Sequence, residues 1–326
     1  MKKEINYDDI AKISGVSKST VSKVLNNYAG VSKKSKELVL KACEKLDYTP
    51  NFLARSLRLN KTNSIGLIVP DLSNQFFSRF CKGVHHEALK NNYTVLIGDS
   101  LESYELEKKL VKEFSARKVD GLIIISTNHK NNYSNSQIPI IFSDRHVEGA
   151  KYEITSDNYL GGYKGMEFLV NKKKRKNILI LSGPKRFETN IQRLNGCKEF
   201  MLNQNFKINY AIKEIESVDV ESAENFAVQN LEFIKKFDAI FALSDLLALG
   251  VLKVIRNKMK VPENISILGF DDIKECEYVT PELSSIHQKK RTMGVEAFNM
   301  VLSLINNNLH KNKIILNVEV VERSST

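Results

Sequence analysis

Two lysines and several hydroxyl side chains share residues 15–26, which read G-V-S-K-S-T-V-S-K-V-L-N. Val16, Val21 and Leu25 supply apolar positions within the segment, which leaves Lys18 and Lys23 on an outward, polar face. Lysine and serine side chains have the size and the hydrogen-bonding groups to read base edges in a DNA major groove. The pattern predicts a short helix that packs through one face and contacts DNA through the other, although a solvated basic face is the plainer interpretation.

Three short helices are expected to hold this segment in place. Asn6, Ser17 and Ser32 each stand where a side chain can cap a helix, and Gly15 suits the turn between the first two helices. The third helix is expected to end near Leu46 and to bury a broad apolar face that includes Leu38. A helix, a glycine-containing turn and a second helix form a helix-turn-helix arrangement.

The charge distribution supports a polyanionic partner for this part of the chain. The chain has 326 residues and a formal net charge of +11. Residues 1–61 contain 13 basic and 6 acidic side chains, whereas the remaining 265 residues contain 36 and 32. Most of the excess positive charge therefore lies in about a fifth of the chain, as expected for a nucleic-acid-binding domain.

A basic and apolar segment follows the three helices. Tyr48-Thr49-Pro50 interrupts the helical pattern, and residues 51–59 then read N-F-L-A-R-S-L-R-L. This segment is long enough for a helix of under three turns, which would be marginal on its own. A plain linker is the alternative interpretation.

From Ile65 onward, short apolar segments alternate with longer amphipathic ones. About ten strands alternating with helices predict an α/β fold with parallel, doubly wound sheets. Ten strands are many for one open sheet, so two α/β lobes with a ligand cleft between them are expected. The predicted fold is a small all-α helix-turn-helix headpiece, a hinge helix and a two-lobed α/β core.

Several classes of protein are disfavoured by what the sequence does not contain. Its apolar runs are shorter than a membrane span, and no secretory signal is visible at the start. The four cysteines, Cys43, Cys81, Cys197 and Cys276, are scattered without a C-x-x-C pair, which favours reduced thiols in a cytoplasmic protein. No nucleophile–base motif, phosphate loop or metal-ligand spacing appears, so neither an enzyme nor a cofactor is expected.

Motifs along almost the whole chain resemble those of the LacI/GalR family of transcriptional regulators. They are Asp9-Ile10-Ala11, residues 15–24, Leu46-Asp47-Tyr48-Thr49-Pro50-Asn51, Ala54-Arg55-Ser56-Leu57, Ser64-Ile65-Gly66-Leu67-Ile68-Val69-Pro70, Val119-Asp120-Gly121-Leu122-Ile123, Asp157-Asn158, Gly161-Gly162, Gly183-Pro184, Arg193 with Gly196, Ser244-Asp245, Ala248-Leu249-Gly250, Val261-Pro262, Gly269-Phe270-Asp271-Asp272, Thr280-Pro281 and Ile286-His287-Gln288. The resemblance implies a homodimer on a pseudo-palindromic operator, with a core similar to periplasmic sugar-binding proteins. It implies a headpiece over 1–48, a hinge over 49–62 and a core over 63–326. Within the core it implies an N-lobe of about 63–157 and 289–312, and a C-lobe of about 158–288 and 313–326.

The same resemblance assigns the DNA contacts. Lys18, Ser19 and Lys23 match the positions that read bases, and Leu57 matches an apolar wedge inserted into the minor groove. The complete expected set is Ser17, Lys18, Ser19, Thr20, Ser22, Lys23, Asn51, Ala54, Arg55, Leu57 and Arg58. Helix capping for the hydroxyls and simple packing for Leu57 are the alternatives.

The resemblance also assigns an effector site in the cleft. Phe76 and Phe77 match an aromatic wall, whose flat rings suit the C–H faces of a sugar. The expected set is Asn74, Phe76, Phe77, Asp144, Arg145, Arg193, Ser244, Asp271 and Gln288. Charged and amide groups of this kind can pair with neighbouring hydroxyls. Core packing for the rings, a turn-bracing role for Asp271 and a surface ion pair for Asp144 and Arg145 are the alternatives.

These observations predict a repressor of carbohydrate-utilisation genes whose operator affinity is controlled by a small sugar, with ribose favoured. Ser244, Val218 and Lys289 depart from residues common among sugar-binding members and leave the ligand open. One alternative is a global carbon-catabolite regulator whose effector is a phosphorylated carrier protein, and another is a sugar-binding protein without a DNA role. Residues 172–176, K-K-K-R-K, are expected to form a solvated loop.

Overall fold

The computed structural model describes residues 5–25, 30–48, 61–308 and 311–326. The chain divides into two compact units, Met1–Thr62 and Asn63–Thr326. The expected hinge helix over residues 51–59 lies outside the described residues, as do Asn51, Ala54, Arg55, Leu57 and Arg58.

The first unit contains the three helices that the sequence predicts, α1 (Tyr7–Ser14), α2 (Lys18–Leu25) and α3 (Lys33–Lys45). The side chain of Asn6 accepts hydrogen bonds from the backbone N–H groups of Asp8 and Asp9, and the Asp9 carboxylate accepts one from the N–H of Asn6. Gly15 ends α1 with φ +69°, a left-handed conformation that favours glycine. These local signals fix where α1 begins and where it ends.

A small apolar core joins the three helices. Ile10, Val21, Val24, Val39 and Ala42 are buried in it. Leu38, which the sequence places on the buried face of α3, is 40% exposed instead, because the core of so small a bundle covers only a narrow stripe of that helix.

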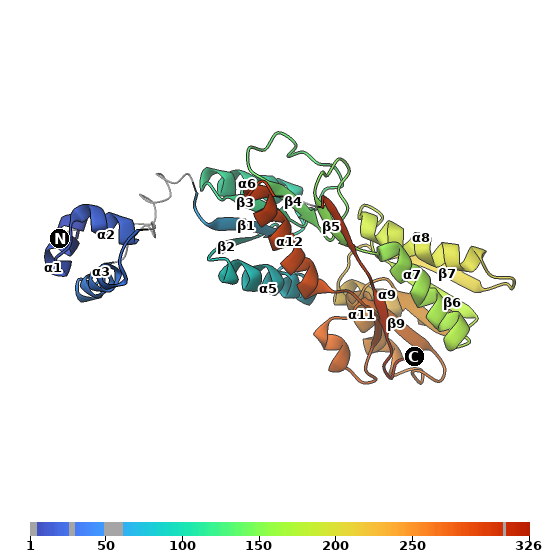
Figure 1. The fold of residues 1–326 in the computed structure, drawn as a ribbon. Helices are drawn as coiled ribbons and strands as arrows, with labels where there is room; N and C mark the ends of the chain where they lie inside the picture. The colour runs from blue at the N-terminus through green and yellow to red at the C-terminus, as the bar shows by residue number, and fades with distance from the viewer. Residues whose placement is uncertain (1–4, 26–29, 49–60, 309–310) are drawn as a thin grey trace. The chain divides into compact units, whose positions relative to one another are not determined.

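The second unit is built on two six-stranded sheets with helices on their faces (Figure 1). The first sheet defines the N-lobe and has the order β11-β5-β4-β3-β1-β2. Its strands are β1 (Ser64–Val69), β2 (Thr94–Asp99), β3 (Gly121–Ile124), β4 (Ile140–Ser143), β5 (Glu153–Ser156) and β11 (Lys313–Leu316). The helices of this lobe are α5 (Gln75–Lys90), α6 (Tyr104–Ala116) and α12 (Lys290–Ile305).

The second sheet defines the C-lobe and has the order β12-β10-β9-β8-β6-β7. Its strands are β6 (Asn177–Ser182), β7 (Asn209–Glu214), β8 (Ala239–Ala242), β9 (Ser266–Asp271), β10 (Ser284–His287) and β12 (Glu319–Val321). Its helices are α7 (Asn158–Glu167), continued by the π-turn Phe168–Lys172, α8 (Glu188–Leu202), α9 (Val220–Gln229), α10 (Leu231–Ile234), α11 (Asp245–Ile255) and the 3-10 turn η2 (Lys274–Glu277). Strand pairing is parallel except between β10 and β12.

The chain passes between the two sheets three times. The passages lie between β5 and α7, between β10 and α12, and between β11 and β12. The third corrects the expected C-lobe segment 313–326, because residues 313–316 form β11 and pair with β5 in the N-lobe sheet. Exposed and half-buried residues alternate in β11, as is typical of an edge strand. Such a pattern does not indicate from the sequence which of the two sheets the strand joins.

The basic run 172–176 is not simply a solvated loop. The Lys173 Nζ lies 2.7 Å from a Glu322 carboxylate oxygen and 2.7 Å from the carbonyl oxygen of Thr326. Arg175 donates to the Ser266 hydroxyl and to the carbonyl oxygen of Pro262. The Lys173 contacts hold Glu322 and Thr326 against the C-lobe, and the exposed Lys172 also pairs with Glu322. Lys174 is exposed, as expected.

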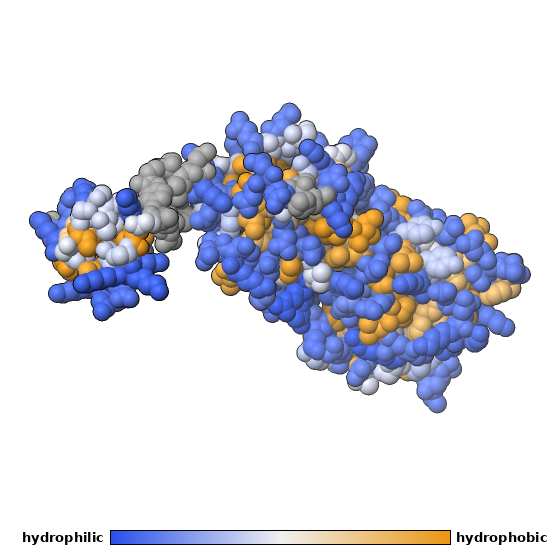
Figure 2. Space-filling model, viewed as in Figure 1, coloured by the Kyte–Doolittle hydropathy of each residue, from blue (hydrophilic) through white to orange (hydrophobic). Residues whose placement is uncertain are grey.

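In both lobes, helices pack closely at glycines. In the C-lobe, a Cβ at Gly196 of α8 would lie 1.9 Å from the carbonyl oxygen of Tyr159 in α7. In the N-lobe, a Cβ at Gly294 of α12 would lie 2.2 Å from the carbonyl oxygen of Phe80 in α5. Hydrophilic residues predominate on the visible surface, with apolar ones scattered between them (Figure 2). No helix among the described residues has the length and hydropathy needed to cross a membrane.

We predict that Gly196→Ala destabilises the core unit. Helix propensity alone would favour alanine by about 1 kcal/mol. The added methyl group would instead collide with α7 backbone, and such overpacking costs about 1–3 kcal/mol. Urea unfolding followed by circular dichroism measures the change, and a variant as stable as the parent would show that α7 and α8 do not pack this closely.

Candidate functional site

In the first unit, α2 presents its polar face to solvent. Lys18, Ser19 and Lys23 are exposed, while Val21 and Val24 are buried beneath them. The Lys18 Nζ lies 2.7 Å from an Asp8 carboxylate oxygen, an exposed ion pair that costs little to exchange for a phosphate or a base.

The hydroxyl groups at the start of α2 have local partners. The Ser17 Oγ accepts a hydrogen bond from the Thr20 N–H at 3.2 Å, so this side chain caps α2. It also lies 2.8 Å from the Ser19 Oγ. The capping alternative therefore describes Ser17, and the lysines remain the outward groups that the expected DNA contact needs.

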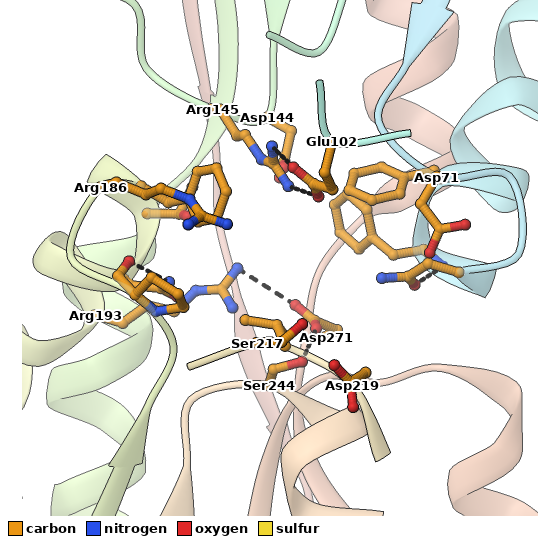
Figure 3. Close-up of a pocket in the computed structure, with 18 residues that line it drawn as sticks. Asp71, Glu102, Asp144, Arg145, Arg186, Arg193, Ser217, Asp219, Ser244 and Asp271 are labelled. Atoms are coloured by element: carbon orange, nitrogen blue, oxygen red, sulfur yellow. Dashed lines mark hydrogen bonds and ion pairs between the residues drawn. The ribbon is translucent and has the colours of Figure 1, made fainter. Parts of the chain in front are cut away.

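In the second unit, a cavity of about 190 Å³ opens between the two lobes (Figure 3). Its polar residues follow the carboxyl ends of parallel strands: Asp71 after β1, Glu102 after β2, Asp144 after β4, Ser244 after β8 and Asp271 at the end of β9. This is where ligands bind in open α/β sheets. The cavity is smaller than the roughly 300–1,000 Å³ of pockets for drug-sized ligands, which favours a small polar solute.

Arg193 forms the floor of the cavity on the C-lobe side. Its guanidinium donates to the Asn158 side-chain oxygen at 2.8 Å and to the Leu243 carbonyl oxygen at 2.7 Å. It also lies 3.3 Å from an Asp271 carboxylate oxygen and 3.8 Å from the centre of the Phe270 ring. Figure 3 shows this arginine reaching toward Asp271.

Arg145 spans the cleft from the N-lobe. Both of its terminal nitrogens contact the Glu102 carboxylate, at 2.6 and 2.8 Å, in a bidentate pair. The same guanidinium lies 4.1 Å from the ring centre of Phe187 in the C-lobe and 5.7 Å from that of Phe77 in the N-lobe. The Arg145 cation therefore contacts aromatic rings of both lobes at the cavity.

Asp144 carries the strongest sign of a ligand. It is buried with φ +61°, and its Oδ1 has no hydrogen-bond partner among the described residues. Burial raises its pKa to about 6, although the charges of Arg193 and Arg145 act in the opposite direction. A buried carboxylate oxygen without a donor is costly, so the site favours a ligand that supplies one.

Asp271 is the second buried carboxylate of the cavity. It adopts φ +116° and accepts hydrogen bonds from the Gln288 amide at 2.6 Å and the Ser244 hydroxyl at 3.2 Å. Burial raises its pKa, and burial likewise raises the pKa of the neighbouring Asp245 to about 7. Strained backbone at two acidic residues facing one cavity is typical of a functional site.

Eight of the nine expected effector residues line this cavity, and Gln288 does not. Gln288 is fully buried and donates to the Asp271 carboxylate, so it orients that carboxylate without facing the effector cavity itself. Asn74 lines the cavity while also capping α5 through the N–H of Phe76.

The expected set also missed several lining residues, namely Asp71, Glu102, Pro184, Arg186, Phe187, Thr189, Asn190, Ser217, Val218 and Asp219. Asp71 and Glu102 share the position just after a strand, which is a signal that a reading of strand ends could have used. Among the described residues no group of His, Cys, Asp and Glu is arranged to hold a metal ion.

A three-helix headpiece and a two-lobed α/β core with a polar cleft define a DNA-binding regulator with a ligand-binding domain. Residues 6–51 match the bacterial regulatory proteins of the lacI family, and residues 166–326 match the periplasmic binding protein-like domain. The chain is 33% identical to the ribose operon repressor of Bacillus subtilis (strain 168), covering 91% of this chain and 90% of that protein. It is 29% identical to the HTH-type transcriptional repressor PurR of Vibrio atlanticus (strain LGP32), covering 97% of each.

Its structure is similar to that of the lac repressor dimer bound to operator and the anti-inducer ONPF. The TM-score is 0.88 at 25% sequence identity, and 99% of each chain is covered. The chain therefore belongs to the lacI family of bacterial regulatory proteins, and it is a DNA-binding transcriptional regulator.

We predict that Asp144→Asn stabilises the unliganded protein in a pH-dependent way. The folded-state pKa of about 6 lies above the ordinary value of 3.8, so ionising this carboxyl opposes folding as the pH rises through that range. A pKa shift of two units corresponds to about 3 kcal/mol in the free energy of unfolding. The asparagine variant should therefore exceed the parent in stability by about that amount near pH 8, and the difference should vanish near pH 4.

Urea unfolding across this pH range measures the difference, with Glu148→Gln as the control because Glu148 is exposed. A gain that did not change with pH would contradict the burial argument.

Proposed function

We propose that this regulator represses carbohydrate-utilisation genes and that a small neutral sugar, ribose first among the candidates, binds in its cleft. The observation that carries the proposal is the unpartnered Oδ1 of the buried Asp144, next to the charged side chains of Arg145 and Arg193. Sugar hydroxyls can donate to carboxylates and accept from guanidinium groups, and they often offer adjacent oxygens that match such pairs.

The apolar wall of the cavity supports the same class of ligand. Phe76 and Phe77 lie edge to face with ring centres 5.3 Å apart, and both line the cavity. Aromatic rings beside carboxylates and guanidiniums match a solute that has C–H faces and hydroxyl edges. The small cavity and the similarity to a ribose operon repressor support a pentose over larger sugars.

The proposed mechanism is a shift between two lobe arrangements. A sugar that contacts both lobes favours the arrangement in which these contacts form together, by as much as its affinities for the two arrangements differ. The headpieces of a homodimer would read the half-sites of a pseudo-palindromic operator, and the hinge over 49–62 would transmit the change. Because a regulator of this kind works on DNA, we propose a cytoplasmic location for it and no catalytic role for the cleft.

We predict that ribose raises the melting temperature of the purified protein, because a ligand that binds only the folded state stabilises it. Asp144→Asn should abolish the shift, since its amide nitrogen faces the donors of the ligand where a carboxylate oxygen is needed. Glucose and nucleosides serve as competing ligands, and Glu148→Gln serves as the control variant. If no sugar shifts the melting temperature while a phosphorylated carrier protein binds, the effector is a protein.

We predict that Lys23→Gln weakens operator binding and lowers its salt dependence. If Lys23 contacts a base, its loss should weaken the free energy of operator binding by about 1–3 kcal/mol. If it neutralises a phosphate, its loss should reduce the slope of log K against log salt by about 0.9. Fluorescence anisotropy with a labelled operator duplex measures both.

Lys41→Gln is the matched control for this test, because Lys41 is an exposed lysine of α3 in the same headpiece. Equal effects of the two substitutions would show that only net charge matters. A chain that bound sugar but no DNA would leave a sugar-binding protein as the remaining interpretation.

A further inference from the structure

A second cavity, of about 370 Å³, lies at the passage from β10 to α12. Gln75 and Arg79 of α5 bound it from the N-lobe, and Lys274 of η2 bounds it from the C-lobe. Residues 287–292, which connect the two lobes, also line it, together with Asp272 and Glu277. None of its lining residues belongs to the effector cavity.

The charges around this cavity are unbalanced. Arg79, Lys289 and Arg291 line it and are exposed, and none of their side chains has an ion pair or hydrogen bond among the described residues. The two acidic lining residues are already paired: Asp272 contacts Arg323 and His287 at 2.7 Å each, and Glu277 pairs with Lys274. Three arginine and lysine side chains are therefore available to an anion.

The start of α12 has the same preference. Lys289 stands at the N-cap, where it offers no acceptor, and Lys290 and Arg291 open the first turn, in which no acidic residue is present. Cations at this end of a helix oppose its dipole, and a side chain with an oxygen acceptor is the usual cap. A bound anion would offset the lysine and arginine charges and suit the positive end of the helix dipole.

Gln288 supplies an observation of a different kind. It is fully buried, lines this cavity, and donates from its Nε2 to Asp271 at 2.6 Å. Its Oε1 has no partner among the described residues. An amide oxygen without a donor favours a ligand that carries a hydroxyl as well as a negative charge.

We propose that this second cavity binds the phosphate group of a small phosphate-bearing solute. A phosphate offers several acceptor oxygens, which match the guanidinium groups of Arg79 and Arg291 and the ammonium of Lys289. A phosphate monoester of a polyol would also donate a carbon-bound hydroxyl proton to Gln288, whereas inorganic phosphate would have to donate its own P–OH proton.

The position of the cavity gives such binding a consequence for the lobes. The backbone N–H of Lys274 in the C-lobe donates to the side-chain oxygen of Gln75 in the N-lobe, so the lobes already touch at this place. Lys290 donates to the carbonyl oxygens of Asp271 and Asp272 on the same passage. An anion held between Arg79 and the start of α12 reinforces the lobe arrangement seen here.

The test is a thermal-shift titration of the 326-residue chain with inorganic phosphate and, separately, with ribose 5-phosphate, at constant ionic strength set with sodium chloride. We expect a saturable rise in melting temperature at millimolar phosphate and at lower concentrations of the ester. Arg79→Gln, Arg291→Gln and their combination should each weaken the apparent affinity by about tenfold or more, because each removes a charge-assisted hydrogen bond.

Lys112→Gln is the matched control, since Lys112 is an exposed lysine of α6 without a partner among the described residues. Equal rises in the parent and in the Arg79 and Arg291 variants would place the anion elsewhere, such as on the headpiece, and would overturn the proposal. So would binding of a phosphorylated protein to this face without any response to small phosphates. Ribose binding to the effector cavity is tested separately, by comparing the parent with Asp144→Asn. If one of the two cavities proves not to bind its ligand, the other proposal can still be tested.

Discussion

The cleft depends on one buried cation, the guanidinium of Arg193. It joins α8, which carries it, to α7 through Asn158, to the end of β8 through the Leu243 carbonyl and to the end of β9 through Asp271. Arg193 of α8, Ser244 just after β8 and Asp271 at the end of β9 line the cavity, and α7 packs against all three of these elements. A charge so deeply buried is tolerable only when its donors are satisfied, so these partners are held in one geometry.

From this cation a continuous set of hydrogen bonds leads to the passage between the lobes. Asp271 accepts from Gln288, and the carbonyl oxygens of Asp271 and Asp272 accept from Lys290 at the start of α12. Asp245 lies beneath, accepting from the Ser285 hydroxyl and the Ile273 N–H. A ligand that changes the charge or position of Asp271 therefore acts on residues next to a segment that both lobes share, which gives the cleft a physical route to the lobe arrangement.

The sequence predicts the fold class and most of the cleft because both rest on local signals. Caps, glycine turns and apolar strands mark the elements, and parallel strands bring their carboxyl ends to one edge. It does not distinguish β5 and β10, which are only four residues long, from the segments around them. The serines of β10 are buried because they find partners in distant parts of the chain. The same reason explains why the sequence misjudged the surroundings of Gln288 and Arg175. The hydrogen-bond partner of each is distant in the chain and cannot be inferred from neighbouring residues.

Both cavities contain residues whose conformation or charge is unfavourable for the stability of the fold. Asp144 and Asp271 combine burial, positive φ and raised pKa values. This combination lowers the stability of the fold, and packing requirements alone do not account for it. Lys289 and Arg291 place positive charge at the positive end of a helix, where a serine or an aspartate would stabilise it. Sequence rules hold along most of this chain, so the positions that break them without a compensating contact are where a ligand has to be sought. The two cavities call for opposite chemistry. The buried carboxylate of Asp144 favours a ligand with hydrogen-bond donors, whereas the basic side chains at the start of α12 favour an anion.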